Sequence, residues 1–311
     1  MLAFLLPISV LLGSSLSLAR PTDLRQPLMY AKRDAAPTPV DAATVQSFAR
    51  PAEFARIAYC TSQAVLSWKC GAPCDALSPG VDVLTAGGDS ADIPFYYIAH
   101  DNATQSIVVA HQGTDAKSIL SIANDAQFLL DDLDAAHFPG APAGIKVHDG
   151  FQKTFLRTAD GKLNGVKAAL NKTGVKKVLV TGHSLGAAIA TMDALMFKLN
   201  LDPSIDITTT VFGLPRGGNP AFADFIDQKL GSSFTFLTNK NDPVPTVPPQ
   251  FIGYKHSQGE VHIQSDGSVV ACPGQENNNC SEGNSLLKVS VANHLGPYVQ
   301  NVSMSHSNCP L

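Results

Sequence analysis

The hydrophobic and polar positions of this chain follow two different periods, and the changes between them predict alternating strands and helices. Short runs of β-branched and aromatic residues are typical of strands, whereas apolar residues three and four positions apart are typical of helices. The expected strands are 94–99, 106–111, 176–182, 207–214 and 234–239, and the expected helices are 41–59, 151–172, 185–199, one that begins at Asn219-Pro220 and one near 294–300. This alternation favours a doubly wound α/β sheet.

Two stretches add detail to that sheet. Residues 185–199 carry one apolar stripe that we expect to lie on the sheet, formed by Leu185, Ala188, Ile189, Met192, Leu195, Met196 and Leu199. Residues 254–271 predict a hairpin that turns at Asp266-Gly267, because this dipeptide favours a tight turn. Since no later segment has the composition of a flexible linker, we expect a single domain over 34–311.

The first 33 residues differ from the rest of the chain. Residues 1–19 are apolar, too short for a membrane span, and end in Ser17 and Ala19 at the spacing of a signal-peptidase site. We expect a signal peptide there, and an N-terminal anchor is the alternative because no basic residue precedes the apolar run. The dibasic pair Lys32-Arg33 stands before a small-residue stretch with prolines, so residues 20–33 are a candidate propeptide.

Charge and composition exclude several classes of partner. The formal net charge is −4, with both signs mixed along the 311 residues. This pattern offers no basic footprint for nucleic acid and no polybasic anchor for anionic membranes. We expect no transmembrane segment, no metal or organic cofactor, and a monomer.

The six cysteines, in a chain that carries a signal peptide, indicate three disulfides. The pairs that spacing favours are Cys70–Cys74, Cys272–Cys280 and, by elimination, Cys60–Cys309. A zinc site at the first pair is the alternative, although no second Cys or His pair stands nearby at zinc spacing. Candidate glycosylation sites agree with export, at Asn102, Asn171, Asn279 and Asn301.

The expected strand 176–182 and helix 185–199 meet in the pentapeptide GHSLG, residues 182–186. It fits the pattern G-x-S-x-G between a strand and a helix, which is the context of a nucleophile elbow. Because glycines allow a turn too tight for side chains, we expect the Ser184 hydroxyl at the open carboxyl edge of the sheet. The N–H of Leu185 is unpaired at the start of the helix and is a candidate oxyanion donor.

A serine hydroxyl needs a base that a carboxylate orients, and here they are expected in the order Ser, Asp, His. Asp242 follows the strand 234–239, where Pro243 prevents continuation. The rival carboxylates lie within helices or in a tight turn: Asp193, Asp224, Asp227 and Asp266. For the base, His294 is best placed, after the last strand and at the start of the closing helix. The other downstream histidines are in the expected hairpin or next to the C-terminal cysteine: His256, His262 and His306.

A second oxyanion donor is expected from the loop AHQGTD, residues 110–115, which follows an apolar strand. Gly113 lets the backbone approach, and Thr114 offers both an N–H and a hydroxyl. Each such donor contributes about 3–4 kcal/mol of transition-state stabilisation. The alternative is an ordinary polar turn after a buried strand.

These motifs resemble the fungal class 3 lipase family over about residues 59–309. The matching stretches are GHSLGAA, VHDGF at 147–151, FGLPRGGNPAFADF at 212–225, DPVPTVPP at 242–249 and PGQEN at 273–277. The resemblance implies an α/β-hydrolase fold and triacylglycerol-lipase-type ester hydrolysis, with Ser184, Asp242 and His294 at the triad positions and Thr114 and Leu185 at the oxyanion positions. PGQEN and PTVPP look closest to secreted members that prefer mono- and diacylglycerols. One departure is Gln112, where many relatives carry an arginine.

The segment after Thr114 mixes apolar and polar residues, and its apolar members are Ile119, Leu120, Ile122, Ala123, Phe128, Leu129 and Leu130. The family carries its lid at this place, so the resemblance implies a lid near 116–130. A short amphipathic piece over a nonpolar cleft hides its apolar face in water and binds an oil surface when open. A helix that packs on the core is the alternative.

The expected function is that of a secreted serine ester hydrolase, which acts on acylglycerols at a lipid–water interface through an acyl-enzyme on Ser184. A feruloyl or other non-lipid carboxylesterase with the same triad is the alternative, and the apolar residues at 119–130 weigh against it. From another class, a lipid-binding or interaction protein that kept the fold and lost the chemistry is the second alternative. The presence of every expected catalytic residue weighs against that reading.

Overall fold

The computed structural model describes residues 35–114, 128–284, 288–306 and 309. All of them belong to one compact unit, Ala31–Leu311. The expected signal peptide at 1–19, the candidate propeptide at 20–33 and most of the expected lid at 116–130 lie outside the described residues.

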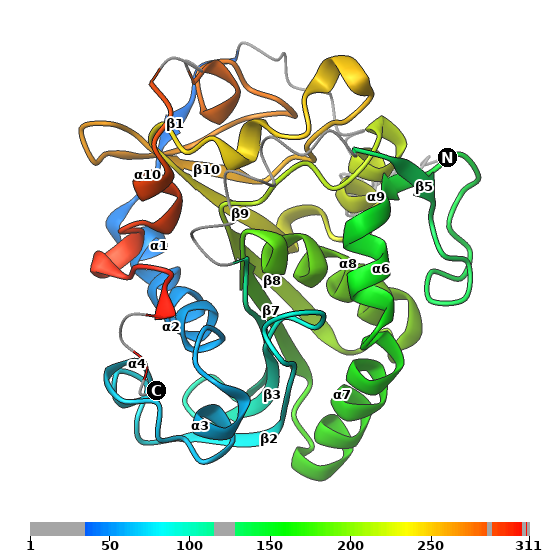
Figure 1. Cartoon of the computed structure of the whole chain (residues 1–311), viewed down its shortest axis with the longest axis vertical. Helices are drawn as coiled ribbons and strands as arrows, with labels where there is room; N and C mark the ends of the chain where they lie inside the picture. The colour runs from blue at the N-terminus through cyan, green and yellow to red at the C-terminus, as the bar shows by residue number, and fades with distance from the viewer. Residues whose placement is uncertain (1–34, 115–127, 285–287, 307–308, 310–311) are drawn as a thin grey trace, which may run out of the picture. The chain divides into compact units, whose positions relative to one another are not determined.

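A nine-stranded sheet runs through the described part of the chain (Figure 1). Its order is β1 (Thr38–Pro39), β11 (Val269–Ala271), β10 (Glu260–Ile263), β9 (Phe234–Asn239), β8 (Asp206–Phe212), β7 (Lys177–His183), β4 (Ser106–His111), β3 (Tyr96–Asp101) and β2 (Val81–Gly87). The central strands from β10 to β4 are parallel, and both edges are antiparallel. A mostly parallel sheet between helices confirms the expected α/β class.

The five strands expected from the sequence are present as β3, β4, β7, β8 and β9, and the expected hairpin is present as β10 and β11. The unexpected strands are β1, β2 and a separate pair, β5 (Leu130–Asp132) with β6 (Lys146–His148). β1, β5 and β6 are too short to show a period. β2 changes register between Val83 and Thr85, which interrupts its alternation.

Two helices expected as single pieces are each divided in the structure. Residues 41–59 form α1 (Ala42–Ser47) and α2 (Ala49–Ile57), and residues 151–172 form α6 (Asp149–Leu156) and α7 (Ala159–Thr173). At the second break the backbone of Thr158 leaves the helical region, with φ −131° and ψ 0°. The other α-helices among the described residues are α3 (Ser62–Leu66), α4 (Ala72–Asp75), α8 (Leu185–Asn200), α9 (Pro220–Lys229) and α10 (Val291–Leu295).

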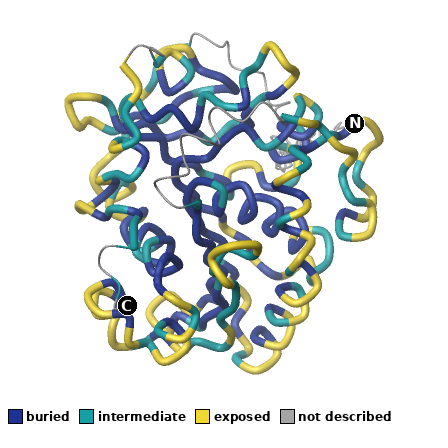
Figure 2. Tube along the Cα trace, in the orientation of Figure 1, coloured by how far each residue is buried: buried dark blue, intermediate teal, exposed yellow. Residues whose placement is uncertain are grey.

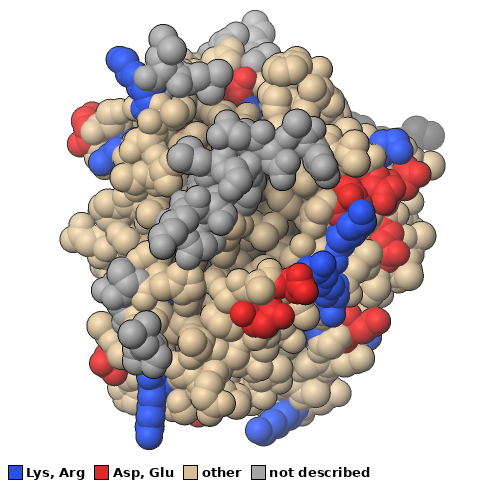
Figure 3. Space-filling model, viewed as in Figure 1, with Lys and Arg blue, Asp and Glu red and all other residues tan. Residues whose placement is uncertain are grey.

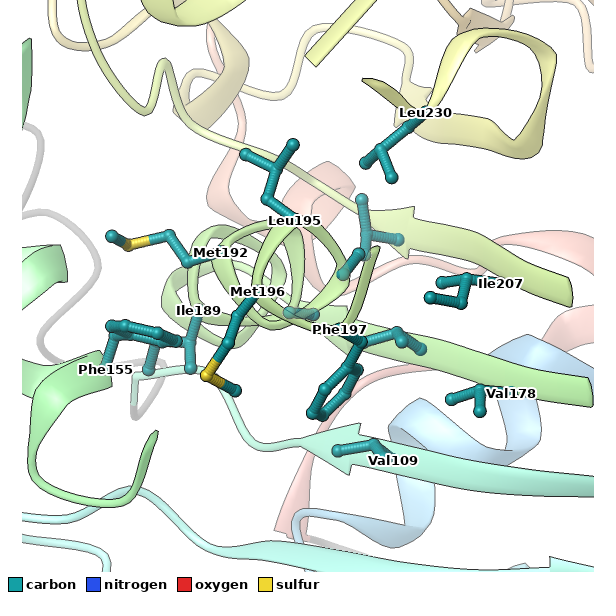
Figure 4. Packing of buried hydrophobic residues seen from close by; sticks show 14 of the residues in the cluster. Val109, Phe155, Val178, Ile189, Met192, Leu195, Met196, Phe197, Ile207 and Leu230 are labelled. Atoms are coloured by element: carbon teal, nitrogen blue, oxygen red, sulfur yellow. The ribbon is translucent and has the colours of Figure 1, made fainter. Parts of the chain in front are cut away.

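The expectation of one apolar stripe on α8 was wrong, because every residue from Gly186 to Phe197 is buried. The helix lies between the sheet and the outer helices α6 and α9, so its outer side is covered as well (Figure 2). Figure 4 shows Phe197 directed toward Val109 and Val178 of the sheet, while Ile189 lies beside Phe155. A helix that is buried on all sides belongs to the interior of a large domain.

Alternating residues of the central strands supply two different cores. In β4, Ile107 and Val109 pack in the cluster that includes α7 and α8. Val108 and Ala110, which point the other way, pack with residues of α2 and α4. Successive side chains of a strand face opposite sides, so a strand buried on both faces reads as a continuous apolar run.

Three disulfides connect Cys60 with Cys309, Cys70 with Cys74, and Cys272 with Cys280. The four sequon asparagines are exposed: Asn102, Asn171, Asn279 and Asn301. Within the described ranges, helices long and apolar enough to cross a bilayer are absent.

Candidate active site

The nucleophile elbow is present where β7 passes into α8. Ser184 adopts φ 58° and ψ −127°, a conformation that a non-glycine residue rarely holds. Its amide donates to the carbonyl of Phe212 in the neighbouring strand at 3.0 Å, which fixes the turn. A Cβ at Gly182 would lie 2.4 Å from the carbonyl oxygen of Gly186, so the turn accepts no larger side chain at that position.

Asp242 and His294 form a buried pair, although 52 positions separate them in the chain. Asp242 follows β9, and its Oδ1 accepts the amide of Val244 at 2.8 Å. Its Oδ2 accepts from His294 Nδ1 at 2.8 Å, and neither side chain is exposed to solvent. Because the carboxylate holds the hydrogen of Nδ1, the neutral ring presents Nε2 as a proton acceptor.

The Nε2 atom of His294 is buried and has no hydrogen-bond partner among the described residues. The structure therefore contains the link between Asp242 and His294, and it lacks a hydrogen bond from the Ser184 hydroxyl to Nε2. His294 nevertheless lies at the elbow, since its ring centroid is 4.4 Å from that of His183. The expectation that His294 starts the closing helix was wrong, because it stands in the last turn of α10.

His183 connects the elbow to the segment that carries His294. Its Nε2 lies 2.8 Å from the main-chain oxygen of His294 and must donate, because a carbonyl only accepts. Its Nδ1 then accepts from the Tyr59 hydroxyl at 2.6 Å. Burial, and secondarily the charge of His294, hold the pKa of His183 well below its usual range, so the ring stays neutral. The sequence alone predicts no role for His183.

The loop with the expected second oxyanion donor packs directly against the elbow. A Cβ on Gly113 would lie 2.8 Å from the Cβ of Ser184 and 2.5 Å from the carbonyl oxygen of His183. A Cβ on Gly186 would lie 2.4 Å from the carbonyl oxygen of Gln112. Thr114 follows, and its buried Oγ1 has no hydrogen-bond partner among the described residues.

Gln112 ties this loop by neutral hydrogen bonds. Its Oε1 accepts the amide of Phe95 at 2.7 Å, and its Nε2 donates to Ser90 Oγ at 2.9 Å. The same Nε2 lies 3.3 Å from Nε2 of His306, close to the Cys60–Cys309 disulfide. A network of hydrogen bonds from the uncharged Gln112 side chain therefore orients this loop.

The aspartates and histidines that the sequence places less favourably have other partners. Asp193, within α8, pairs with His111 and Lys162. His256 contacts the carbonyl of Pro245, and His262 contacts Thr238. In the described part of the chain, one group of metal-binding residue types lies close together, namely Glu260, Cys272 and Cys280. Its two sulfurs are bonded to each other and so are not free to hold an ion.

Leu185 begins α8, so its N–H has no carbonyl four residues back within the helix. It stands directly after Ser184, as an oxyanion donor requires. Of the expected lid, only Phe128, Leu129 and Leu130 fall within the described residues.

The chain is similar to known lipases in sequence and in fold. A sequence profile described as "Lipase (class 3)" matches residues 108–252. The chain is 40% identical over 173 residues to the secreted mono- and diacylglycerol lipase LIP1 of Malassezia globosa, covering 55% of this chain and 57% of that protein. It is 32% identical over 260 residues to MDL3, a secreted mono- and diacylglycerol lipase of the same organism, covering 82% and 81%. The match therefore spans little more than half of LIP1 but most of MDL3.

The fold is also similar to that of the solved Lip2 lipase from Yarrowia lipolytica. The TM-score is 0.77 at 26% sequence identity, and the match covers 88% of this chain and 99% of the other. The fold is thus shared with a solved lipase over nearly the whole of that protein.

Proposed function

We propose that this chain, which belongs to the class 3 lipase family, is a secreted serine hydrolase of acylglycerol esters. The observation that carries the proposal is the buried Asp242–His294 pair beside the strained Ser184 elbow. The names of the relatives support mono- and diacylglycerols as substrates, and they also support export. Four exposed sequon asparagines and three disulfides fit an exported chain.

The proposed reaction has two halves. His294 Nε2 takes the proton of the Ser184 hydroxyl while the oxygen attacks the ester carbonyl, and the imidazolium then returns the proton to the departing glyceride alcohol. Water repeats the sequence on the acyl-enzyme and releases the fatty acid. Asp242 accepts the Nδ1 hydrogen and holds the ring in one tautomer. Hydrogen bonds at such sites often form only when substrate is bound, which accommodates the unpartnered Nε2 of His294.

Thr114 and Leu185 are the proposed oxyanion donors. Leu185 offers the free N–H at the start of α8, and Thr114 follows the glycine that packs on Ser184. Loss of one donor in such a site lowers kcat by about 10²- to 10³-fold.

The variant Ser184→Ala tests the chemistry. We expect hydrolysis of p-nitrophenyl butyrate to fall by about 10⁴-fold or more while the melting temperature is unchanged. Retained turnover by this variant would remove the acyl-enzyme on Ser184 from consideration.

A feruloyl or other non-lipid carboxylesterase with the same triad is the second candidate. Rates on emulsified diacylglycerol, emulsified triacylglycerol and a methyl cinnamate ester separate the two. We expect the highest rate on diacylglycerol, and a preference for the cinnamate would favour the alternative.

A further inference from the structure

Three ionisable side chains meet inside the core, at the point where β4 ends. His111, the last residue of β4, donates from Nε2 to Oδ2 of Asp193 in α8 at 2.6 Å. The other carboxylate oxygen, Oδ1, lies 2.7 Å from Nζ of Lys162 in α7. Neither Lys162 nor Asp193 exposes any of its side chain, and His111 exposes 2%. By contrast, Figure 3 shows lysine, arginine, aspartate and glutamate side chains at the surface, where water solvates them.

Stability alone is a weak reason for burying these charges. Moving an ion pair out of water is costly, and the attraction between the two ions often does no more than offset that cost. Apolar side chains of similar volume are often as stable in the same place, or more stable. A charged hydrogen bond differs from apolar packing in direction, because it restricts both a distance and an angle. The direction here is imposed on His111.

His111 is the residue from which the loop with the proposed oxyanion donor Thr114 departs. α8 contacts His111 at two levels. In the first turn of this helix, a Cβ on Gly186 would lie 2.6 Å from the carbonyl oxygen of His111, so the two main chains touch. About two turns further along the same helix, Asp193 holds the imidazole ring. Both the main chain and the side chain of His111 are therefore fixed relative to α8.

The same helix begins with the other proposed oxyanion donor, the N–H of Leu185. Two donors act together only if each lies about 3 Å from the position of one oxyanion. The separation of Leu185 from Thr114 therefore matters for the transition state. The contacts of α8 with His111 set one end of the loop that decides this separation.

We propose that His111 and Asp193 are positioning residues, which hold the loop of Thr114 at the distance from Leu185 that an oxyanion requires. Lys162 supplies the positive charge that lets Asp193 remain a carboxylate within the core. This inference rests on the proposed function, because it gives the three side chains a part in that reaction. They act through the loop, since they lie in the core and not at the reacting atoms.

An apolar replacement of all three side chains separates positioning from stability. The triple variant combines Lys162→Met, Asp193→Leu and His111→Phe, which fill similar shapes without a charge. Its free energy of unfolding in urea should match or exceed that of wild type. We expect its kcat on p-nitrophenyl butyrate to fall by about tenfold to a hundredfold with little change in KM, because the donors act in the transition state.

Two single variants at His111 leave the Lys162–Asp193 pair in place, and they decide the question if the triple variant does not fold. His111→Phe removes the hydrogen bond to Asp193, so its kcat should also fall. His111→Gln keeps an N–H donor and should recover part of this loss. Ile207→Ala is the control, because Ile207 is a core residue at the other end of β8. It should lower the free energy of unfolding and leave kcat unchanged.

Inhibition by hexyl trifluoromethyl ketone reports on the oxyanion position itself. The serine adds to the ketone carbonyl and leaves an oxyanion between the proposed donors, so the adduct imitates the transition state. In the triple variant and in His111→Phe, Ki should rise by the same factor by which kcat/KM falls. A role in stability alone would leave Ki unchanged.

Two results would overturn the positioning role. One is a kcat of the triple variant, or of His111→Phe, equal to that of wild type. The other is a fall in kcat with no rise in Ki for the ketone. If wild type itself does not cleave p-nitrophenyl butyrate, the proposed function fails and the positioning role fails with it. If wild type cleaves the ester and the variants match it, the positioning role alone fails.

Discussion

His183 donates its Nε2 hydrogen to the main-chain oxygen of His294 at 2.8 Å, so the residue before the proposed nucleophile holds the segment that carries the proposed base. The Tyr59 hydroxyl fixes the opposite nitrogen of the same ring. A second donor, the Tyr298 hydroxyl, reaches the same oxygen at 2.9 Å. The distance between nucleophile and base therefore depends on a neutral imidazole outside the proposed triad.

The variant His183→Phe tests this positioning role. It removes both hydrogen bonds, so we expect kcat on p-nitrophenyl butyrate to fall by about tenfold to a hundredfold with little change in KM, because the base segment shifts. His183→Gln keeps a donor and should recover part of kcat. Tyr298→Phe, which removes the other bond to this oxygen, is the control with a smaller effect. An unchanged kcat in His183→Phe would show that the segment is held by other contacts.

Features that depend on neighbouring residues could be predicted from the sequence, whereas features that depend on residues distant in the chain could not. The elbow was predictable because a strand, a glycine turn and a helix follow each other within a few residues. The pairing of Asp242 with His294 was predictable because both residues come after strands, in the order Ser, Asp, His along the chain. The bonds of His183 and Gln112 were not predictable, because their partners Tyr59, Ser90 and His306 are distant in the chain. The complete burial of α8 was missed since it depends on α6 and α9.

Acid should destabilise this protein through its buried histidines, because burial lowers the pKa of His111, His183, His256 and His262. Burial lowers the pKa of His256 to about 4 and that of His262 to about 4, against 6.5 in the unfolded chain. Between these values the unfolded state binds more protons, so stability falls as pH drops from about 6.5 to 4. Each proton contributes about 1.4 kcal/mol per pH unit. Urea unfolding at several pH values measures the slope, and His262→Asn should lower it by up to about 1.4 kcal/mol per pH unit while the part due to the other histidines remains. A flat profile in this window would contradict the assignment.

Arg216 is a buried cation that holds the loop after Asp242. Its guanidinium donates to both oxygens of Glu276 at 2.8 and 2.9 Å, pairs with Glu282, and reaches the carbonyls of Thr246 and Pro248. Burial opposes ionisation of Glu276, but the hydrogen bond from Arg216 lowers its pKa to about 2.

Arg216→Ala should therefore cost about 3–5 kcal/mol of unfolding free energy, because it leaves a buried carboxylate without its cation. Arg216→Lys keeps the charge and loses the two-pronged geometry, so its loss should be intermediate. Lys146→Ala serves as the control, since the side chains of its pair with Asp132 are 44% and 79% exposed. Urea unfolding at pH 7 gives the three values, and equal losses for Arg216→Ala and Lys146→Ala would contradict the argument.

Lys162, Asp193 and His111 form a fully buried ionic cluster between α7, α8 and β4. Lys162 Nζ lies 2.7 Å from Asp193 Oδ1, and His111 Nε2 lies 2.6 Å from Oδ2. Burial lowers the pKa of Lys162, while the same ammonium helps to keep the pKa of Asp193 low against its own burial. The cluster joins α7, α8 and the end of β4, next to the loop that carries Thr114.

A double-mutant cycle separates the attraction within this cluster from the cost of burying it. Lys162→Met leaves Asp193 without its cation, and Asp193→Asn leaves Lys162 without its anion, so each should lose about 3–5 kcal/mol. The double variant removes both charges together and should be more stable than the sum of the two losses implies, by at least about 1 kcal/mol. Urea unfolding of the four proteins at pH 7 measures the difference. Strict additivity would mean that the 2.7 Å pair contributes no net attraction.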